Sequence, residues 1–305
     1  MRAIRYSIKD LENLTGIKAH TIRMWEQRYN IVEPKRTETN IRYYDPEDLK
    51  RMLNISLLNQ NGFKISRIAK MKSAELHHKV RETIAKASGD YQSQIKALTV
   101  AMIELDEEQF EKVMSTNILQ IGFEKTMIEI VYPFLMRVGT LWTTDAINPS
   151  QEHFITNLIR QKIIVAIDGQ VTRSDDRMPK YMLYLPSGEL HEISLLFSYY
   201  LLKSRGNHVV YLGQSLPLDD LEEAYKIHRP DFILTLITSV PGAGVQSYLD
   251  QLSEKFPEAT TLVSGYQIVG QYIQPADNIV PLAKVQDLVT FAEEQKQLYQ
   301  RMRNV

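Results

Sequence analysis

The stretch "YMLYLPSGELHEISLL", Tyr181–Leu196, begins with a short apolar run and continues through a glycine-containing turn into a second apolar segment. A run of about five apolar residues bounded by turn residues is typical of a buried strand. Four similar runs, rich in branched and aromatic residues, follow it: "HVVYL" (208–212), "FILTLI" (232–237), "TLVSG" (261–265) and "NIVPL" (278–282). Helical segments are expected at residues 191–205, 218–228, 245–256 and 285–303. Alternating strands and helices predict a parallel sheet with helices on both faces.

Residues 178–305 are therefore expected to form an α/β domain of the Rossmann-like, flavodoxin-like class. Ligands of such sheets bind at the carboxyl ends of the strands. His191 lies in the turn after the first strand, so it is either a ligand-binding residue or an ordinary turn residue. No Gly-x-Gly-x-x-Gly motif follows the first strand and the sequence has no Walker loop, which argues against a dinucleotide or a nucleoside triphosphate.

The region before this domain has a different periodicity. Between residues 91 and 174, apolar residues recur every three or four positions, as in Ile95, Leu98 and Met102, and we expect a four-helix bundle. Its last helix is expected to begin at "NPSQEH", where Asn148 and Gln151 have the spacing of a capping box. The polar residues 76–90 are interpreted as a linker, largely helical.

Composition and charge limit the possible functions. The chain of 305 residues has no cysteine, which excludes disulfides, thiolate zinc sites and a cysteine nucleophile. It has neither a signal-peptide apolar region nor a run approaching the roughly 20 apolar residues of a membrane span, so a cytoplasmic protein without membrane contact is expected. Residues 1–75 carry 15 Lys or Arg against 9 Asp or Glu, whereas the remaining 230 carry 21 against 28. A basic module on an acidic body suits nucleic-acid binding, although an uneven solvated surface would look the same.

The basic module, residues 1–75, has the order of elements found in winged helix-turn-helix domains. Two short helices, "YSIKDLENLTG" and "IKAHTIRMWEQRYN", are joined by a Thr-Gly turn, and a basic hairpin and a third helix follow. Side chains that can reach phosphates or base edges lie on the second helix (Ile17–Tyr29) and on the hairpin. The candidates for DNA contact are Lys18, His20, Thr21, Arg23, Arg28, Arg36, Asn40, Arg42 and Tyr43.

Four features of the first 70 residues resemble the DNA-binding domain of the MerR-type transcription regulators: Thr15-Gly16, "TIRMWEQRY" (21–29), Pro34 with Arg36, and "NIRYYDPEDL" (40–49). The resemblance implies that Arg23 and Arg42 contact promoter DNA and that Tyr43 lies beside its backbone. The form "WEQRY" is similar to the branch of this family that carries a cobalamin-type domain. Sensing of a metal through thiolates is excluded because there is no cysteine.

The stretch "GELHEIS" resembles the Asp/Glu-x-His-x-x-Gly signature of cobalamin-binding domains. The resemblance implies that His191 is the lower ligand of the cobalt and that Glu189 orients its ring. It also assigns Thr235 to the Ser of a Ser-x-Leu element, and Ser264-Gly265 to a Gly-Gly pair. Ser194 and Ser264 depart from the pattern, which has glycine at both positions. The resemblance implies that these glycines let the nucleotide tail of the cofactor pass close to the backbone.

A second pattern lies in "LWTTDAINPSQEHF" (141–154), where nine residues separate Trp142 from Glu152-His153. It resembles a pattern of light-sensing, adenosylcobalamin-dependent regulators of the MerR type. There, the resemblance implies, these three residues cover the upper face of the corrin around the adenosyl group. Without that role, Trp142 would be a core residue of the bundle, and Glu152 and His153 would be surface groups.

Together these observations predict a three-domain transcription regulator that is not an enzyme. It would bind double-stranded promoter DNA as a homodimer or tetramer, with RNA polymerase or an accessory protein as a further partner. Cobalamin, in its adenosyl form, is the expected cofactor, and light is a candidate signal. In one alternative the C-terminal half is a degenerate, cofactor-free module for dimerisation or protein interaction. In another, which the N-terminal module argues against, the chain is a subunit of a cobalamin-dependent methyltransferase.

Overall fold

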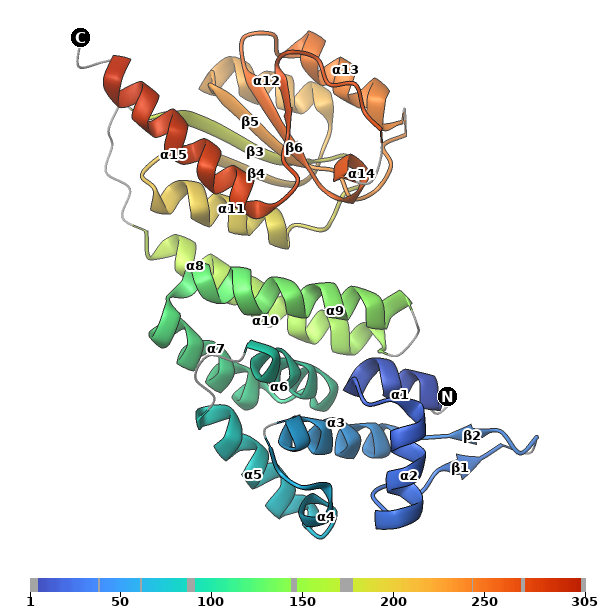
Figure 1. Ribbon diagram of the computed structural model, residues 1–305. Coiled ribbons are helices and arrows are strands. Elements are labelled where there is room, and N and C mark those ends of the chain that lie inside the picture. Colours follow the sequence, from blue (N-terminus) through green and yellow to red (C-terminus); the bar gives the residue numbers. More distant parts are fainter. Residues whose placement is uncertain are drawn as a thin grey trace. The chain divides into compact units, whose positions relative to one another are not determined.

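The computed structural model (Figure 1) describes residues 5–37, 39–60, 62–86, 91–143, 147–170, 178–242, 244–269 and 272–302. The chain divides into two compact units, Met1–Leu158 and Ile159–Val305, which are described separately. Among the described residues, no helix is both long and apolar enough to cross a membrane.

The first unit begins with the expected helix-turn-helix and wing. Its elements are α1 (Ile8–Thr15), α2 (Ala19–Tyr29), the antiparallel strands β1 (Lys35–Arg36) and β2 (Arg42–Tyr43), α3 (Pro46–Gln60) and α4 (Ile65–Ile68). Ser7 and Asp10 form a capping box at the start of α1, and Gly16 ends it in a left-handed conformation (φ 73°). Tyr6 and Tyr44 exchange backbone hydrogen bonds of 2.8 Å, which tie the chain start to the end of the wing.

Helices fill the rest of this unit: α5 (Ser73–Lys86), α6 (Tyr91–Glu104), α7 (Glu107–Ile121), α8 (Phe123–Thr126), the π-helical segment η1 (Met127–Val131), α9 (Tyr132–Thr143) and the first half of α10 (Pro149–Asp168), whose residues from Ile159 onward belong to the second unit. Since α8, η1 and α9 run on without a break, α6–α10 are the four helices that the periodicity predicted. Asn148 and Gln151 form the expected capping box: the Gln151 backbone N–H donates to the Asn148 side chain over 3.0 Å, and the Asn148 backbone N–H donates to the Gln151 side chain over 3.1 Å.

Helix α5 covers most of residues 76–90, which the sequence analysis interpreted as a largely helical linker. It packs against α3, α6 and α7, and Leu76 and Val80 are buried. These two apolar residues lie one helical turn apart on an otherwise charged segment, which is why the segment resembles a linker in sequence. Residues 87–90 lie outside the described part of the chain.

The second unit is built around a five-stranded sheet. The strands are β3 (Lys180–Pro186), β4 (His208–Leu216), β5 (Phe232–Leu236), β6 (Thr260–Ser264) and β7 (Ile279–Pro281), all parallel, in the order β4-β3-β5-β6-β7. The helices are α11 (Ile193–Ser204), α12 (Leu218–His228), α13 (Val245–Lys255), α14 (Tyr266–Val269) and α15 (Val285–Met302). Helices α11 and α15 cover one face of the sheet, and α12 and α13 the other (Figure 1). The flavodoxin-like fold predicted from the sequence is confirmed.

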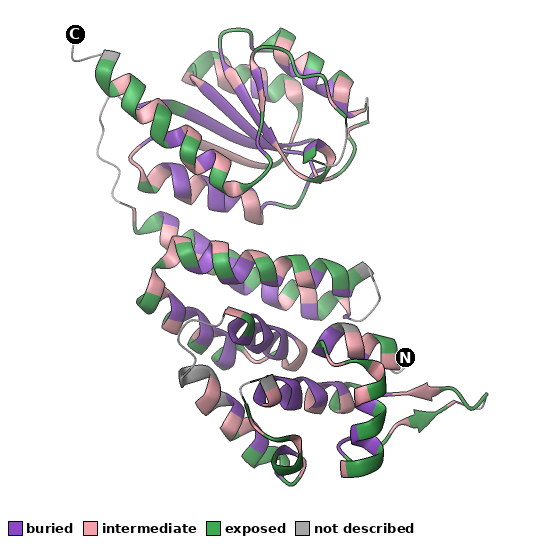
Figure 2. Cartoon of the chain, in the orientation of Figure 1, coloured by how far each residue is buried: buried purple, intermediate pink, exposed green. Residues whose placement is uncertain are grey.

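The central strands β3 and β5 are buried almost from end to end (Figure 2). From β3 the chain first adds β4 on one side and then β5 on the other. The connections after β3 and β5 therefore leave the sheet in opposite directions. Such a switch point opens a crevice at the carboxyl ends of the two strands, where ligands of this fold class bind.

Candidate functional site

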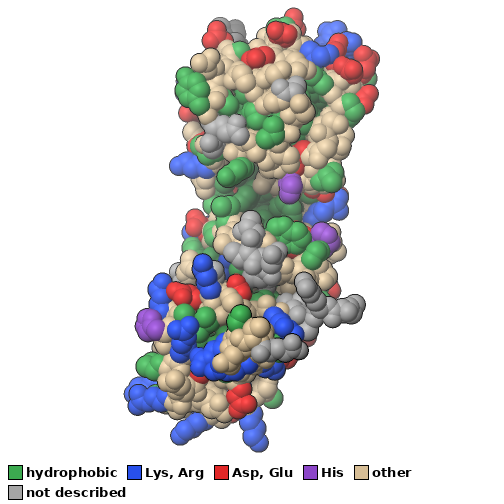
Figure 3. Space-filling view, turned by 90° about the vertical axis from the view of Figure 1, so that its right-hand side faces the viewer, with side chains coloured by type: hydrophobic (Ala, Val, Ile, Leu, Met, Phe, Trp, Pro, Cys, Tyr) green, Lys and Arg blue, Asp and Glu red, His purple; other side chains and the backbone are tan. Residues whose placement is uncertain are grey.

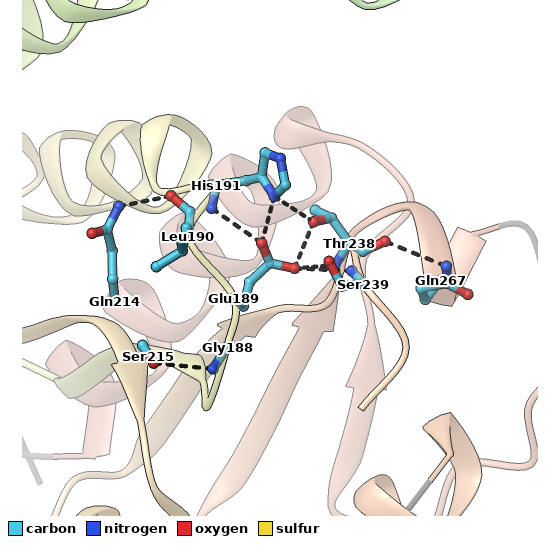
Figure 4. Close-up of polar contacts among 9 residues, drawn as sticks. All are labelled: Gly188, Glu189, Leu190, His191, Gln214, Ser215, Thr238, Ser239 and Gln267. Atoms are coloured by element: carbon cyan, nitrogen blue, oxygen red, sulfur yellow. Dashed lines mark hydrogen bonds and ion pairs between the residues drawn. The ribbon is translucent and has the colours of Figure 1, made fainter. Parts of the chain in front are cut away.

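The connection after β3 brings Glu189 and His191 to this edge of the sheet (Figure 4). Glu189 is only 3% exposed, and one of its oxygens accepts from the His191 backbone N–H at 3.0 Å and lies 2.6 Å from the His191 ring atom Nδ1. The His191 side chain is 74% exposed. A buried carboxylate thus holds one ring nitrogen of an imidazole whose other nitrogen, Nε2, is left available at the surface.

The other oxygen of Glu189 contacts the connection after β5. It accepts from the Thr238 backbone N–H (3.0 Å), the Thr238 hydroxyl (2.5 Å) and the Ser239 backbone N–H (2.9 Å). Burial by itself raises the pKa of a carboxyl group, but hydrogen bonds to the charged form outweigh burial here and lower the pKa of Glu189 to about 2. Glu189 therefore remains a carboxylate and joins the two sides of the switch point.

Edge strand β4 holds the same connection from the other side. The Gln214 side-chain amide donates to the Leu190 carbonyl over 2.7 Å, and the Ser215 hydroxyl accepts from the Gly188 N–H over 3.0 Å. Ser215 has a left-handed backbone (φ 51°), and the pairing of β4 with β3 shifts register near its end. These irregularities turn the last residues of β4 over the 188–190 loop.

Glu192, directly after His191, is also buried and polar. It accepts a hydrogen bond from Arg160 on α10, and a second one of 3.1 Å from the Tyr211 hydroxyl on β4. Burial and this carboxylate together raise the pKa of Tyr211. Both residues that flank His191 are thus fixed, Leu190 through its backbone and Glu192 through its side chain.

Three other residues assigned to the cofactor by resemblance do not join this cluster. Thr235 is fully buried in β5, so its side chain does not lie on the surface that carries His191. The Ser264 hydroxyl donates to the Leu282 carbonyl over 2.7 Å instead of projecting freely. Gly265 lies so close to the connection after β5 that an added Cβ would be 2.4 Å from the Ile237 carbonyl oxygen.

Trp142, Glu152 and His153 belong to the first unit. Trp142 is 46% exposed, so the interpretation of it as a bundle core residue is wrong. His153 is exposed and its Nδ1 lies 2.5 Å from the Glu152 carboxylate. The three residues lie on either side of the α9–α10 connection, whose residues 144–146 are outside the described part.

The candidate DNA interface carries exposed cations. Figure 3 shows Lys and Arg side chains gathered over the N-terminal part of the chain. On α2, Arg23 and Arg28 are exposed, as are His20 and the preceding Lys18, while Thr21 is half-buried. In the wing, the Arg36 guanidinium donates to the Asn40 side chain over 2.8 Å, and the Arg5 guanidinium lies 4.6 Å from the ring centre of Tyr43.

Glu26, a residue that the sequence did not single out, connects α2 to the wing. It is 9% exposed and accepts a hydrogen bond of 2.5 Å from the Tyr44 hydroxyl, while its other oxygen lies 3.7 Å from Arg42. Burial, and then this carboxylate, raise the pKa of Tyr44. The helix and the wing are therefore linked by a buried side-chain network.

Thr238, Ser239, Gln214 and Ser215 were also missed in the sequence. They lie 23 or more residues from His191 and meet the 188–191 connection only because β4 and β5 are the neighbours of β3. The "TS" pair (238–239) directly after the run "FILTLI" was the available signal, since connections on either side of a switch point converge.

Comparisons with known families match two segments, which lie almost entirely within the first unit. Residues 6–75 match the family described as MerR HTH family regulatory protein, and residues 94–166 match the family described as B12 binding domain. The HTH-type transcriptional repressor CarH of Myxococcus xanthus is 26% identical over 258 residues, 83% of this chain and 85% of the relative. CarA, also an HTH-type transcriptional repressor of Myxococcus xanthus, is 27% identical over 238 residues, 74% of each chain. Among solved structures, the monomethylamine corrinoid protein of Methanosarcina barkeri has a TM-score of 0.36 at 14% identity, covering 79% of this chain and 95% of that one.

Proposed function

We propose that this chain, a MerR-type transcriptional regulator with a B12-binding domain, senses a cobalamin through His191 and changes its hold on promoter DNA in response. The observation that carries the proposal is the Glu189–His191 pair at the switch point. The ring nitrogen Nδ1 is held 2.6 Å from a buried carboxylate, so Nε2 of an exposed imidazole is aimed outward. This is how proteins orient a histidine that ligates a metal.

The residues around His191 suit a metal ion that is bound within a cofactor. Among the described residues, no group of three or more His, Cys, Asp or Glu side chains could hold a bare ion. A corrin already supplies four nitrogens to its cobalt and needs one imidazole from the protein. Exposed apolar side chains also lie on the connections at this edge of the sheet, namely Leu190, Val240, Tyr266 and Val269. A largely apolar ring system would cover part of them.

A bound cobalamin would supply a cobalt centre whose upper ligand can be exchanged or, in the adenosyl form, released by light. This chain's residues would hold the lower position: Glu189 keeps Nδ1 protonated and Nε2 free to ligate. The sequence pattern assigns Trp142, Glu152 and His153 to the upper face, and the exposure of Trp142 and His153 leaves them available for it. We further propose that the adenosyl form is the ligand, that its state controls assembly into a homodimer or tetramer, and that assembly sets operator affinity.

Dark incubation with adenosylcobalamin, followed by desalting and an absorbance spectrum, tests the proposal. The wild type is expected to retain the cofactor with the spectrum of histidine ligation, and His191→Ala is expected to lose that spectrum. His78→Ala is the matched control, because it removes an exposed histidine to which no cofactor contact is assigned. A wild type that retains no cobalamin would refute sensing and favour a cofactor-free module for dimerisation.

A further inference from the structure

The sheet face beneath Thr235 is filled by side chains of this chain. In the register of the parallel strands Thr235 pairs with Tyr184 of β3 and Val263 of β6, so the three side chains point to the same face of the sheet. All three are fully buried. Thr235 is the residue that the cobalamin-domain resemblance assigned to the Ser of a Ser-x-Leu element.

A tyrosine from helix α13 completes the filling. The Tyr248 hydroxyl lies 2.8 Å from the Tyr184 hydroxyl, and Tyr248 is only 8% exposed. Both rings belong to the hydrophobic core that α12 and α13 form with this face, together with Ile233, Leu249 and Leu252. Close-packed interiors leave little unused space. A tail that reached Thr235 would have to displace at least one tyrosine from this core.

The edge of the sheet above this core is closed as well. The Ile237 N–H donates to the Ser264 carbonyl over 2.8 Å, and the Gln267 N–H donates to the Ile237 carbonyl over 3.1 Å. The Gly265 backbone approaches Ile237 so closely that no side chain fits there. The connections after β5 and β6 thus contact each other directly where the tail would have to enter.

We propose that this chain holds its corrinoid at His191 with the nucleotide tail outside the fold, so that corrinoids without a tail are also ligands. This inference rests on the proposed function, because it needs His191 as the lower ligand. It assigns Tyr184 and Tyr248 as the residues that exclude the tail. The ligand class is then defined by the corrin ring and its cobalt and is wider than cobalamin.

The tail then hinders binding. In free cobalamin, the base at the end of the tail occupies the lower cobalt position, and His191 has to displace it. In a domain that encloses the tail, contacts to the tail offset the free energy needed to displace the base. In the arrangement proposed for this chain, the fold makes no such contacts. Cobinamide, which has the corrin but no tail, offers His191 a cobalt carrying only exchangeable water. It is therefore expected to bind at least as tightly as cobalamin.

Absorbance titrations of the full-length chain with aquacobalamin and with diaquacobinamide test this inference. The wild type is expected to bind diaquacobinamide with an equal or lower Kd, and His191→Ala is expected to weaken binding of both. Tyr248→Ala removes one side of the tyrosine pair and should tighten aquacobalamin binding alone, by about tenfold or more. Tyr248→Phe keeps the ring and loses only its hydroxyl, so it should behave as the wild type does.

The outcomes separate the two proposals. If the wild type binds aquacobalamin at least tenfold more tightly than diaquacobinamide, the tail is housed by the fold and only this inference is overturned. Binding of neither corrinoid would overturn the proposed function and this inference together. Because the wild-type comparison needs no variant, it decides the inference even if Tyr248→Ala proves unstable.

Discussion

Each of the two candidate sites places a surface side chain, half-buried Arg42 or exposed His191, against a buried glutamate, but the two glutamates are held differently. Glu26, behind the wing, contacts the Tyr44 hydroxyl and the cation of Arg42. Glu189, behind His191, is held by three backbone N–H groups, the Thr238 hydroxyl and the His191 ring. The first carboxylate meets a cation that phosphates also attract. The second is fixed by the backbone of two connections.

The difference fits the function that we propose for each region. A DNA-reading arginine has to exchange partners between the protein and a phosphate, so a loose contact such as the 3.7 Å between Arg42 and Glu26 is suitable. A histidine that ligates the cobalt has to keep one orientation before the cofactor binds, so a supporting carboxylate held by backbone N–H groups suits it better. The comparison predicts that removing the carboxylate of Glu189 damages the fold, whereas changes at the wing alter DNA binding.

The largest effect is expected from Glu189→Ala. Three buried or half-buried backbone N–H groups would lose their acceptor, at a cost of about 2–4 kcal/mol in the free energy of unfolding. Urea denaturation followed by circular dichroism measures it. Glu222→Ala is the control, since Glu222 forms exposed ion pairs with Lys226 and Lys255 and its loss should leave the midpoint unchanged. Equal destabilisation by both variants would contradict the structural role of Glu189.

A pH dependence should follow from the same carboxylate. The pKa of Glu189 in the folded chain is about 2, below the value near 4.3 of an unfolded glutamate. The unfolded state therefore takes up the proton first, and the stability that Glu189 contributes is fully present above about pH 5 and is lost as the pH falls toward 2. Urea midpoints measured between pH 6 and pH 3 should fall less steeply in Glu189→Gln than in the wild type. Parallel curves for the two proteins would show that Glu189 does not titrate in this way.

Wing and helix variants should affect DNA binding without affecting stability. Arg23→Ala and Arg42→Ala each remove a cation at the surface of the N-terminal unit. For each cation that contacts a phosphate, the slope of log K against log salt should become shallower by about 0.9. Fluorescence anisotropy with duplex promoter DNA at several salt concentrations measures this slope. Lys226→Ala, which removes a cation from the second unit, should leave it unchanged.

Much of this arrangement was predictable because it is local in sequence. The capping boxes at Ser7 and Asn148 depend on residues three positions apart, and the Glu189–His191 pair on residues two apart. The strands were predicted for a similar reason, since each is a continuous apolar run.

The partners of the two glutamates were not predictable in this way. Tyr44 is 18 residues from Glu26, and Thr238 is 49 from Glu189. Which strand or helix supplies these partners depends on topology, which no single stretch specifies. Thr235 shows the same limit. Its position matched a sequence pattern, but the register of β5 turns its side chain toward Tyr184 in the core.

The smallest effect is expected at edge strand β4, which also contacts the loop that carries His191. If the His191 loop is held rigidly from both sides, the contact from β4 should contribute to ligand retention as well as the contacts to Glu189. Gln214→Ala removes only the exposed hydrogen bond to the Leu190 carbonyl, and such a bond contributes about 0.5–1 kcal/mol. Dissociation of a bound corrinoid from His191, followed by absorbance, should therefore become about two- to fivefold faster.

Gln246→Ala is the matched control for that measurement. Its side-chain amide also donates to a backbone carbonyl on the surface of the second unit, that of Gln274, over 2.9 Å, but it holds a different connection. If both variants release the ligand equally fast, the effect belongs to the domain as a whole and β4 does not position the loop. If only Gln214→Ala releases the ligand faster, the contact from β4 also positions the loop that carries His191. The difference between the firmly held His191 and the loosely paired Arg42 then includes the weakest hydrogen bond of the site.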